Sequence, residues 1–462
     1  MAIELINTDE ASGYAPRMAS DEPWPPAGQA WYAVFVCSLA LLVNFLDRGI
    51  LNLLVEPIKA DLHLTDVQMS LVMGFAFVAF YVVLGLPIAR LVDYRSRKLI
   101  LASGIAIWSV MTAACGLAGN FWQLFGARVG VGVGEACQGP GTFSMLSDYF
   151  PKEKLPKAIA FLNFGYTTGN GLALIIGGVV IAVLNTLPPV SLPVLGLVRS
   201  WQLTFFCVGI PGLVVSLLLT TVKEPKRRGI APDGSSGAFI RPTPVREVAA
   251  FVRQNASTFV PMFAGLAIQT MLAFGNAGWI PAFFHRTYSW SASKVGLVQG
   301  LVYLVVWPIG AMLGSALAER WTRKGLDDAN MRVAVLAAAL VLPGNILFPL
   351  MPTPELAVAV SVWNGLCAAL VLGPQNAALQ VITPGQMRGQ ITALFLFVFN
   401  VIGFGCGPFV VALFTDLVFK SEADLRYAMA TAAATLGPVT LVLLIVALKP
   451  YARSVARARA WS

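Results

Sequence analysis

Charged side chains are scarce in this chain of 462 residues. Asp, Glu, Lys and Arg together make up only 12% of it, and histidine occurs twice. Soluble globular domains carry about 25% of these four residues. A share this low excludes an ordinary water-covered surface, and with it most soluble enzymes and binding modules.

Motifs that carry catalysis or hold metals are also missing. His63 and His285 lie at the ends of predicted helices, far apart in the sequence, and the six cysteines form no CxxC pair. The chain has no Walker A, HExxH or GxSxG sequence and no cluster of Ser, His and Asp. We therefore predict no enzymatic activity, no metal site, no disulfide framework and no cofactor.

Apolar residues are what the chain has in abundance, at 57% of the sequence. A helix needs about 20 mostly apolar residues to cross roughly 30 Å of hydrocarbon. Twelve runs of this kind lie between residues 31 and 449. The sequence therefore predicts an all-α polytopic membrane protein with twelve transmembrane helices in two six-helix bundles.

The formal net charge of +9 is concentrated in short loops on one predicted side of the membrane. Such a bias marks cytoplasmic loops, so we expect both termini in the cytoplasm and no nucleic-acid partner. The polar, acidic start of the chain lacks the features of a cleavable signal peptide. We predict a disordered cytoplasmic tail, a first bundle, a cytoplasmic linker, a second bundle and a basic cytoplasmic tail, with boundaries 1–30, 31–222, 223–255, 256–449 and 450–462.

A short pattern recurs at equivalent places in the two predicted bundles. Asp93 precedes Arg97 in the loop after the second helix, and Glu319 precedes Arg323 in the corresponding loop of the second half. The dipeptides at 139–140 and 373–374 are both Gly-Pro and also correspond. Two six-helix halves in the same orientation are typical of secondary transporters.

The predicted fourth helix, 121–148, contains two opposite charges, Arg128 and Glu135. They lie two turns apart on one face, and Gly126, Gly130 and Gly134 lie on the opposite face, which predicts a close helix contact there. An ionised side chain at the centre of a span costs roughly 2.5 to 3.5 kcal/mol on insertion scales. The two charges indicate either a buried structural ion pair or a water-filled cavity, and we favour the cavity.

The first helix carries a polar stripe that includes Asn44, Asp47 and Arg48. Asp47 and Arg48 are adjacent, and adjacent residues on a helix do not face each other, so each needs another partner. We expect Asp47 to be ionised beside Arg128, and Glu135, which lies deeper, to hold a proton. Asp47, Arg128 and Glu135 are our candidates for proton coupling, with the proton as the coupling ion.

Further polar and aromatic side chains interrupt the apolar spans near the expected midplane. We predict that some of them line a central substrate cavity together with Arg48 and Asn44. These candidates are Tyr166, Asn170, Gln269, Asn276, Tyr303, Gln375 and Asn400.

The twelve spans and the loop pattern resemble the major facilitator superfamily over about residues 31–449. That family's first loop reads G-x-x-x-D-R-x-G-R-R, and here Ala89, Tyr94 and Ser96 depart from it. Within the superfamily the first half resembles the Spinster family of lipid transporters. The resemblance rests on Asp47-Arg48, Ile58-Lys59, Asp61-Leu62, Leu64, Asp66, Gln68, Arg128, Gly130, Gly132, Gly134-Glu135-Ala136, Pro140, Asp148 and Phe150-Pro151.

The resemblance implies proton-coupled alternating access and a lysophospholipid or sphingoid-phosphate substrate. It also implies conformational gating by Asp93, Arg97, Glu319 and Arg323. An Asp-Arg pair in the first helix occurs in organic-anion symporters too, so a transporter of small organic anions or drugs is the alternative. We expect a monomer in the lipid bilayer of a bacterial inner membrane, with protons and an amphipathic substrate as its partners.

Overall fold

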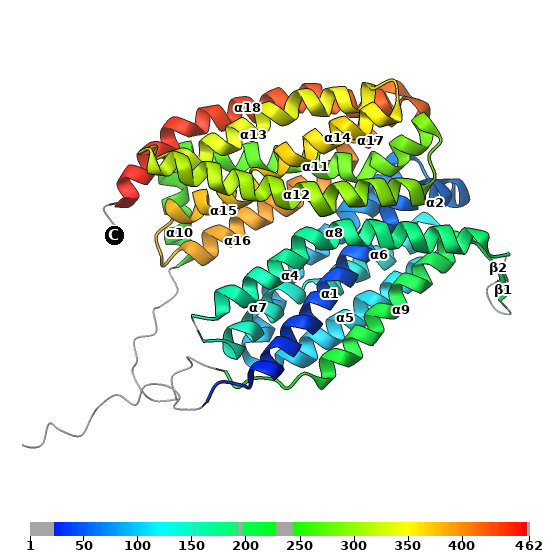
Figure 1. Ribbon diagram of the computed structural model, residues 1–462, viewed down its shortest axis with the longest axis horizontal. Coiled ribbons are helices and arrows are strands. Elements are labelled where there is room, and N and C mark those ends of the chain that lie inside the picture. Colours follow the sequence, from blue (N-terminus) through cyan, green and yellow to red (C-terminus); the bar gives the residue numbers. More distant parts are fainter. Residues whose placement is uncertain (1–22, 152, 189, 193–195, 228–243, 460–462) are drawn as a thin grey trace, which may run out of the picture.

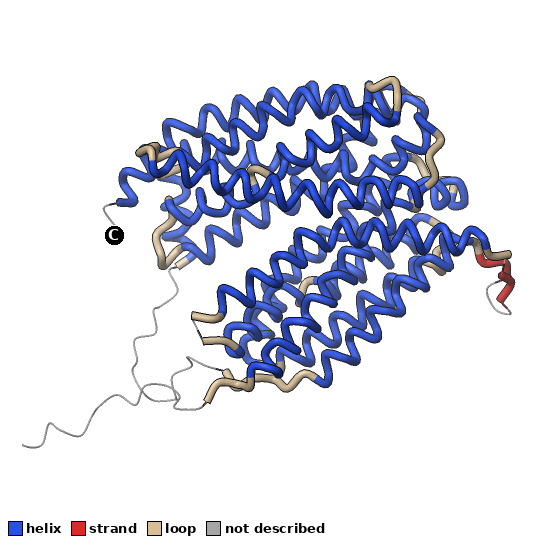
Figure 2. The backbone as a smooth tube through the Cα atoms, in the orientation of Figure 1, coloured by secondary structure: helices blue, strands red, loops and turns tan. Residues whose placement is uncertain are grey.

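The computed structural model describes residues 23–151, 153–188, 190–192, 196–227 and 244–459. Most of the predicted N-terminal tail, the middle of the linker and residues 460–462 lie outside this part. Nearly all described residues are helical, and the only strands among them are two of three residues each, which form a hairpin (Figure 2). The elements of the first half are α1 (Ala27–Leu53), α2 (Val55–Leu62), α3 (Asp66–Ser70), η1 (Leu71–Phe75), α4 (Ala76–Tyr94), α5 (Arg97–Cys115), α6 (Phe121–Glu135), α7 (Gln138–Tyr149), α8 (Leu155–Thr186), β1 (Val190–Leu192), β2 (Gly196–Val198) and α9 (Ser200–Thr221).

The second half repeats this arrangement after a short helix in the predicted linker. Its elements are α10 (Val245–Gln254), α11 (Ala256–Tyr288), α12 (Ala292–Arg323), α13 (Ala329–Leu347), η2 (Phe348–Leu350), α14 (Pro354–Ala369), α15 (Leu372–Val381), α16 (Arg388–Val398), η3 (Phe399–Gly405), α17 (Cys406–Leu413), η4 (Phe414–Phe419), η5 (Glu422–Asp424) and α18 (Leu425–Ala458). The linker segment 244–255 is thus partly helical, and α18 extends beyond residue 449. It does so because its last turns pack on the bundle, where the Tyr451 hydroxyl donates to the Ala378 carbonyl at 3.2 Å.

Eleven helices in the described residues are long and apolar enough to cross a membrane. The predicted fourth span is the exception, because polar residues such as Arg128, Glu135 and Gln138 lower its mean hydropathy. It is also divided into α6 and α7. The division falls at Ala136, four residues before Pro140, whose ring clashes with the carbonyl at that position. In the second half α14 and α15 separate at Leu370, four residues before Pro374. The repeated Gly-Pro thus breaks the equivalent helix in each half.

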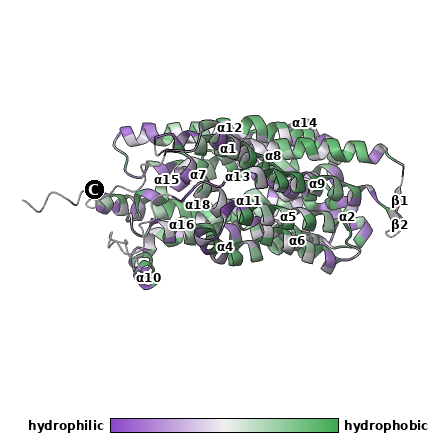
Figure 3. Ribbon diagram, turned by 90° about the horizontal axis from the view of Figure 1, so that it is seen from below, coloured by the Kyte–Doolittle hydropathy of each residue, from purple (hydrophilic) through white to green (hydrophobic). Residues whose placement is uncertain are grey.

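The two halves form separate bundles that meet at one end and diverge at the other (Figure 1). We call the end where β1 and β2 lie the hairpin end, and the end where α9 finishes and α10 begins the linker end. Hydrophobic residues cover the helices along their length, and hydrophilic residues stand out around α10 at the linker end (Figure 3). The sequence Thr65-Asp66-Val67-Gln68 forms a reciprocal capping box that starts α3 at the hairpin end.

Glycines allow α8 of the first half and α12 of the second half to touch at the backbone. A Cβ atom on Gly296 would lie 2.6 Å from the Leu174 carbonyl oxygen, and one on Gly171 would lie 2.7 Å from that of Gly300. These contacts belong to the hairpin-end part of both helices. Closure at this end therefore depends on the absence of side chains at the contact.

We predict that Gly296→Ala opens the hairpin end, because the added methyl group cannot be accommodated without separating α8 from α12. Spin labels on the exposed residues Trp122 and Leu347, with the native cysteines replaced, should report a longer distance in this variant. Gly126→Ala is the control, since a Cβ there would meet nothing within 4 Å. An unchanged distance in Gly296→Ala would show that the glycine contact does not hold the end closed.

Candidate functional site

Three ionisable side chains are buried inside the first bundle. Asp47 on α1 and Arg128 and Glu135 on α6 are all essentially inaccessible to solvent, and none of them lines either of the two cavities described below. They are thus buried in this conformation, whereas the sequence analysis favoured a water-filled cavity around them. Moving an ion out of water costs several kcal/mol unless partners compensate it. The partners of these groups therefore determine what this region can do.

Glu135 is paired with Arg48 on the neighbouring helix α1. Arg48 Nε lies 3.1 Å and Nη2 2.5 Å from Glu135 Oε2. The Arg48 guanidinium also lies 4.3 Å from the centre of the Phe77 ring and 5.6 Å from that of Phe404, which belongs to the second half. The Arg48 side chain is 24% exposed, whereas that of Glu135 is fully buried. Arg48 therefore links a buried carboxylate to an accessible surface.

The expected ion pair between Asp47 and Arg128 is not formed. Among the described residues, both carboxylate oxygens of Asp47 and the Nε and Nη1 atoms of Arg128 have no hydrogen-bond partner. Arg128 does not pair with Glu135 either, because seven residues along a helix separate them by about 10 Å. Arg48 takes Glu135 instead, since it reaches across from α1.

Asp47, Arg128 and Thr112 on α5 nevertheless belong to one polar region. The charge of Arg128 and the hydroxyl of Thr112 both influence the Asp47 carboxyl. The Thr112 hydroxyl and Glu135 Oε1 also lack a hydrogen-bond partner within the described ranges. Buried polar groups of this kind normally bond to ordered water or carry a proton. The region is thus suited to receive a proton or to exchange one with water.

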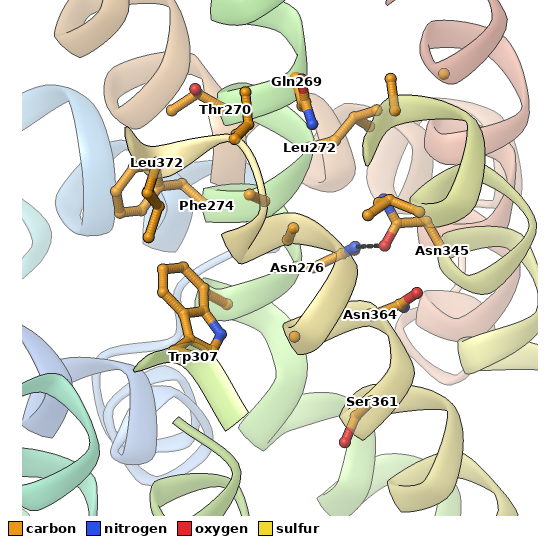
Figure 4. Close-up of a pocket in the computed structure, with 18 of the residues that line it drawn as sticks. Gln269, Thr270, Leu272, Phe274, Asn276, Trp307, Asn345, Ser361, Asn364 and Leu372 are labelled. Atoms are coloured by element: carbon orange, nitrogen blue, oxygen red, sulfur yellow. Dashed lines mark hydrogen bonds between the residues drawn. The ribbon is translucent and has the colours of Figure 1, made fainter. Parts of the chain in front are cut away.

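A cavity of about 210 Å³ lies entirely within the second bundle. Four of the predicted substrate-binding residues line it: Gln269, Asn276, Tyr303 and Gln375. Figure 4 shows Gln269, Asn276 and Trp307 around this cavity, and Asn276 Nδ2 donates to Asn345 Oδ1 at 3.1 Å. The prediction named neither Asn345 nor Gln299 and Ser361, which also line the cavity. The signal was available, since each is a polar residue inside an apolar run.

The other predicted substrate-binding residues lie elsewhere. Asn44 is buried in α1, and Asn170 lies on α8, outside the lining of this cavity. Tyr166 also belongs to α8, but its side chain is outside the described part of the structure. Asn400 lies in the π-helical segment η3, where its Nδ2 donates to the Leu396 carbonyl at 2.7 Å. Asn376 of α15 makes the same kind of bond to the carbonyl four residues back, so Asn400 bonds to its own helix and does not line the cavity, which the sequence pattern did not anticipate.

The predicted gating residues lie at the linker end. Arg97 is buried and donates to Asp148 on α7, to the Ser144 carbonyl and to the Pro225 carbonyl. Its backbone N–H donates to Glu224 Oε1 at 2.7 Å. Asp93 is exposed, and its backbone carbonyl accepts from Arg227.

The counterpart pair in the second half is different. Glu319 and Arg323 form an ion pair one turn apart on α12, and both side chains are mostly exposed. In the first half, by contrast, the linker residues Glu224, Pro225 and Arg227 fasten the loop between α4 and α5. In this conformation the loop of the first half is therefore held by the linker, whereas Glu319 and Arg323 of the second half pair with each other.

A buried charge network joins the halves at the hairpin end. Arg286 of α11 lies 2.8 Å from Glu56 Oε1 and 2.8 Å from both carboxylate oxygens of Asp66 in the first half. Lys59 also pairs with Asp66, and its Nζ lies 2.9 Å from Glu422 Oε2 in the second half. The sequence alone did not indicate this network, because it does not show which residues the two halves bring together.

Comparison with known proteins gives matches over most of the chain. Residues 37–408 match the sequence model of the Major Facilitator Superfamily. A protein of Mycolicibacterium smegmatis described as an MFS-type efflux pump is 27% identical, with 89% of this chain and 88% of that protein covered. Protein spinster of Drosophila melanogaster is 23% identical over 84% of this chain, which spans 62% of that protein.

A hexuronate transporter of Escherichia coli is 23% identical, with 69% of this chain and 73% of that protein covered. Among solved structures, a bacterial homolog of the human lysosomal transporter Spinster, in an inward-facing and unoccupied conformation, matches with a TM-score of 0.77. It is 24% identical, and the match covers 94% of this chain and 99% of that one. The fold is therefore that of a twelve-helix transporter in two bundles, as predicted.

We predict that Arg286→Met loosens the hairpin end, because it leaves Asp66 and Glu56 without a partner from the other half. Breaking a buried pair costs about 3 to 5 kcal/mol. Hydrogen exchange should become faster near Val67, whose N–H donates to Asp416 across the halves at 2.8 Å. Arg199→Met is the matched control, since Arg199 pairs with Asp61 inside the first half. Equal exchange in the two variants would contradict the role of Arg286.

The linker-end network predicts an acid-sensitive contribution to stability. Burial alone would raise the pKa of the Glu224 carboxyl, but hydrogen bonds from Ser96 and Arg97 hold this pKa below its ordinary value. Its stabilising effect is therefore complete above the unfolded-state pKa of about 4.3 and is lost as the pH falls through the lower folded-state value.

Glu224→Gln should accordingly lower the thermal unfolding midpoint at pH 7, and the difference from the wild type should shrink in acid. Glu319→Gln, which removes an exposed pair, should have little effect at either pH. A Glu224→Gln difference that stays constant with pH would show that the network does not depend on the ionised carboxylate.

Proposed function

This chain belongs to the major facilitator superfamily and is a Spinster-like membrane transporter, and we propose that it moves an amphipathic lipid by proton-coupled alternating access. The substrate would be a lysophospholipid or a sphingoid-phosphate-like molecule. One observation carries the proposal: a partly exposed arginine, Arg48, holds the carboxylate of a buried group of ionisable residues. A single side chain could thus respond both to a substrate and to a proton.

The coupling step begins at the Arg48–Glu135 ion pair. A proton that neutralises Glu135 removes the charge that holds Arg48, so the guanidinium becomes free to bind an anionic group. Asp47, which has no hydrogen-bond partner among the described residues, is a second place for the proton beside Arg128. Movement of the proton between these carboxyls would favour one conformation over another, because it changes which pairs are charged.

Alternating access requires the two ends to open in turn. In this conformation Arg286 ties the halves together at the hairpin end, and Arg97 binds only groups of the first half and the adjoining linker. We take the linker end, with its many basic residues, as cytoplasmic, so this conformation would face inward. The reverse state would break the Arg286 network and bring the linker-end loops near Asp93 and Glu319 together.

An apolar groove supplies a place for the acyl chain of such a lipid. It lies between α1 and α8, has a volume of about 220 Å³ and includes Phe35, Leu39 and Phe161. The groove and Arg48 share helix α1. Phe35 and Leu39 lie roughly 140° to 180° around the axis of α1 from Arg48, so an acyl chain in this groove would have to pass around α1 from a phosphate at Arg48.

A small organic anion is the second candidate substrate, because one of the relatives is named as a hexuronate transporter. Its carboxylate would occupy the same place at Arg48. We propose that the protein acts as a monomer in a bacterial inner membrane in either case.

The proton step is tested by measuring lysophospholipid flux into proteoliposomes under an imposed pH gradient. Asp47→Asn and Glu135→Gln should each abolish the dependence of flux on the gradient, because each removes a site for the proton. Glu355→Gln, which alters an exposed carboxylate in the first turn of α14, is the control and should keep it. If the flux depends on the pH gradient in both buried variants as it does in the wild type, this mechanism is excluded.

A binding measurement tests the role of Arg48 separately. Arg48→Ala should weaken binding of a lysophospholipid by about tenfold or more, since a hydrogen bond to a charged group contributes roughly 1.5 to 3 kcal/mol. The wild type could instead bind organic anions but no lysolipid. If Arg48→Ala then weakens the binding of those anions, the second candidate replaces the first.

A further inference from the structure

The cavity of the second bundle is rich in amides and lacks charge. Among the described residues that line it there is no acidic, basic or histidine side chain. Six side-chain amides line it instead: Gln269, Asn276, Gln299, Asn345, Asn364 and Gln375. A hydrocarbon chain makes no use of such groups, so their concentration in one cavity calls for another kind of ligand.

Several of these amide atoms have no hydrogen-bond partner. Within the described ranges, both Nε2 and Oε1 of Gln269 and Oδ1 of Asn364 are buried and unpaired. Asn276 and Asn345 bond to each other, which uses one donor and one acceptor and leaves the remainder available. Figure 4 shows Gln269 and Asn364 on different sides of the cavity. Asn364 Oδ1 lies against Gly344 of α13, so its side chain would have to rotate to meet a ligand, whereas Gln299, Asn276 and Gln375 line the cavity as well.

The unpaired atoms specify the chemistry of the ligand. Gln269 offers both a donor and an acceptor, and Asn364 Oδ1 needs a donor. An ionised phosphate or carboxylate only accepts hydrogen bonds, and an acyl chain does neither. A hydroxyl group does both. We propose that this cavity binds a neutral, hydroxyl-bearing part of the substrate, such as a polyol or a sugar ring.

Aromatic rings give the cavity a wall for such a group. Tyr303 and Trp307 both line it, and their ring centres are 5.0 Å apart. The cavity volume of about 210 Å³ is below the roughly 300 to 1,000 Å³ of pockets that enclose whole drug-sized ligands. It therefore suits one part of a larger substrate or one small sugar derivative.

A chain of rings connects the cavity to the candidate anion site. Arg48 lies 5.6 Å from the Phe404 ring, whose centre lies 4.8 Å from that of Phe274, and Phe274 lines the cavity. This inference rests on the proposed function in one respect, that Arg48 binds the anionic group. The substrate would then be an anion with a hydroxylated neutral portion. Its anionic group would bind Arg48 in the first half and its neutral portion would bind Gln269 in the second, so the substrate would bridge the two halves.

Two sources offer this chemistry, a lipid head group with a polyol and a free sugar acid. Each is tested with a matched pair of probes on the purified full chain in nanodiscs. For the lipid, oleoyl lysophosphatidylglycerol is compared with oleoyl lysophosphatidylpropanol, which has the same charge but lacks the two head-group hydroxyls. For the sugar acid, galacturonate is compared with cyclohexanecarboxylate. Equilibrium binding is measured by titration calorimetry.

The wild type should prefer the hydroxylated member of at least one pair by about tenfold or more, as expected when buried polar groups gain partners. Gln269→Leu should remove this preference and leave the affinity for the hydroxyl-free probe unchanged. Asn364→Leu tests the second amide independently. Gln380→Leu is the control, because Gln380 lies outside the cavity and bonds to Thr392.

Equal affinities within both pairs for the wild type would overturn the inference. So would an equal loss of affinity for both members of a pair in Gln269→Leu. A lysolipid that binds without any preference for hydroxyls, together with no preference for galacturonate, would contradict the cavity assignment and leave the proposed transport of lipids intact. A preference limited to galacturonate, with no lysolipid bound, would support the cavity assignment and contradict the lipid substrate.

Discussion

The ion pair between Arg48 and Glu135 is the interaction on which the site depends. Its two members come from α1 and α6, and its acid is buried while its base is partly exposed. Inside a bundle surrounded by hydrocarbon, a charge must be paired, hydrated or neutralised by a proton. Glu135 is paired, but Asp47 and the Nε and Nη1 atoms of Arg128 have no hydrogen-bond partner among the described residues. The first bundle thus has one satisfied ion pair beside unsatisfied groups, an arrangement in which a single proton can redistribute the partners.

The two halves divide the chemistry between them. Buried ionisable groups lie in the first bundle, and the second bundle holds an uncharged cavity with amide and aromatic walls. Phe404 joins these regions, since its ring faces both Arg48 and Phe274. Charge reappears between the halves at the hairpin end, where Arg286, Lys59 and Asp66 form a buried network. A substrate that spans Arg48 and the cavity would therefore act on the same interface that Arg286 closes.

Sequence patterns predicted the number of spans and the two halves, and they singled out Asp47, Arg128 and Glu135, because the energetic cost of placing polar groups in hydrocarbon makes each of them stand out. They favoured a water-filled cavity around these charges, which are buried in this conformation. They also selected Gln269, Asn276, Tyr303 and Gln375, which share one cavity. They did not predict partners. The choice of Arg48 over Arg128 for Glu135 depends on the rotation of α1 against α6, and helical periodicity describes each helix only by itself.

Contacts between the halves were harder still to predict from the sequence. The Arg286 network and the backbone contact at Gly296 exist only where α11 and α12 meet the first bundle, so they depend on the conformation as well as on the fold. Asn400 was also placed wrongly, because its amide bonds to its own helix instead of lining the cavity.

The most direct test of the central claim is infrared difference spectroscopy of the purified protein as the pH is lowered. If a proton breaks the Arg48–Glu135 pair, the wild type should gain a protonated-carboxyl band that is absent or shifted in Glu135→Gln. The same band in both the wild type and Glu135→Gln, unchanged in position and size, would show that Glu135 takes no proton and would contradict the account.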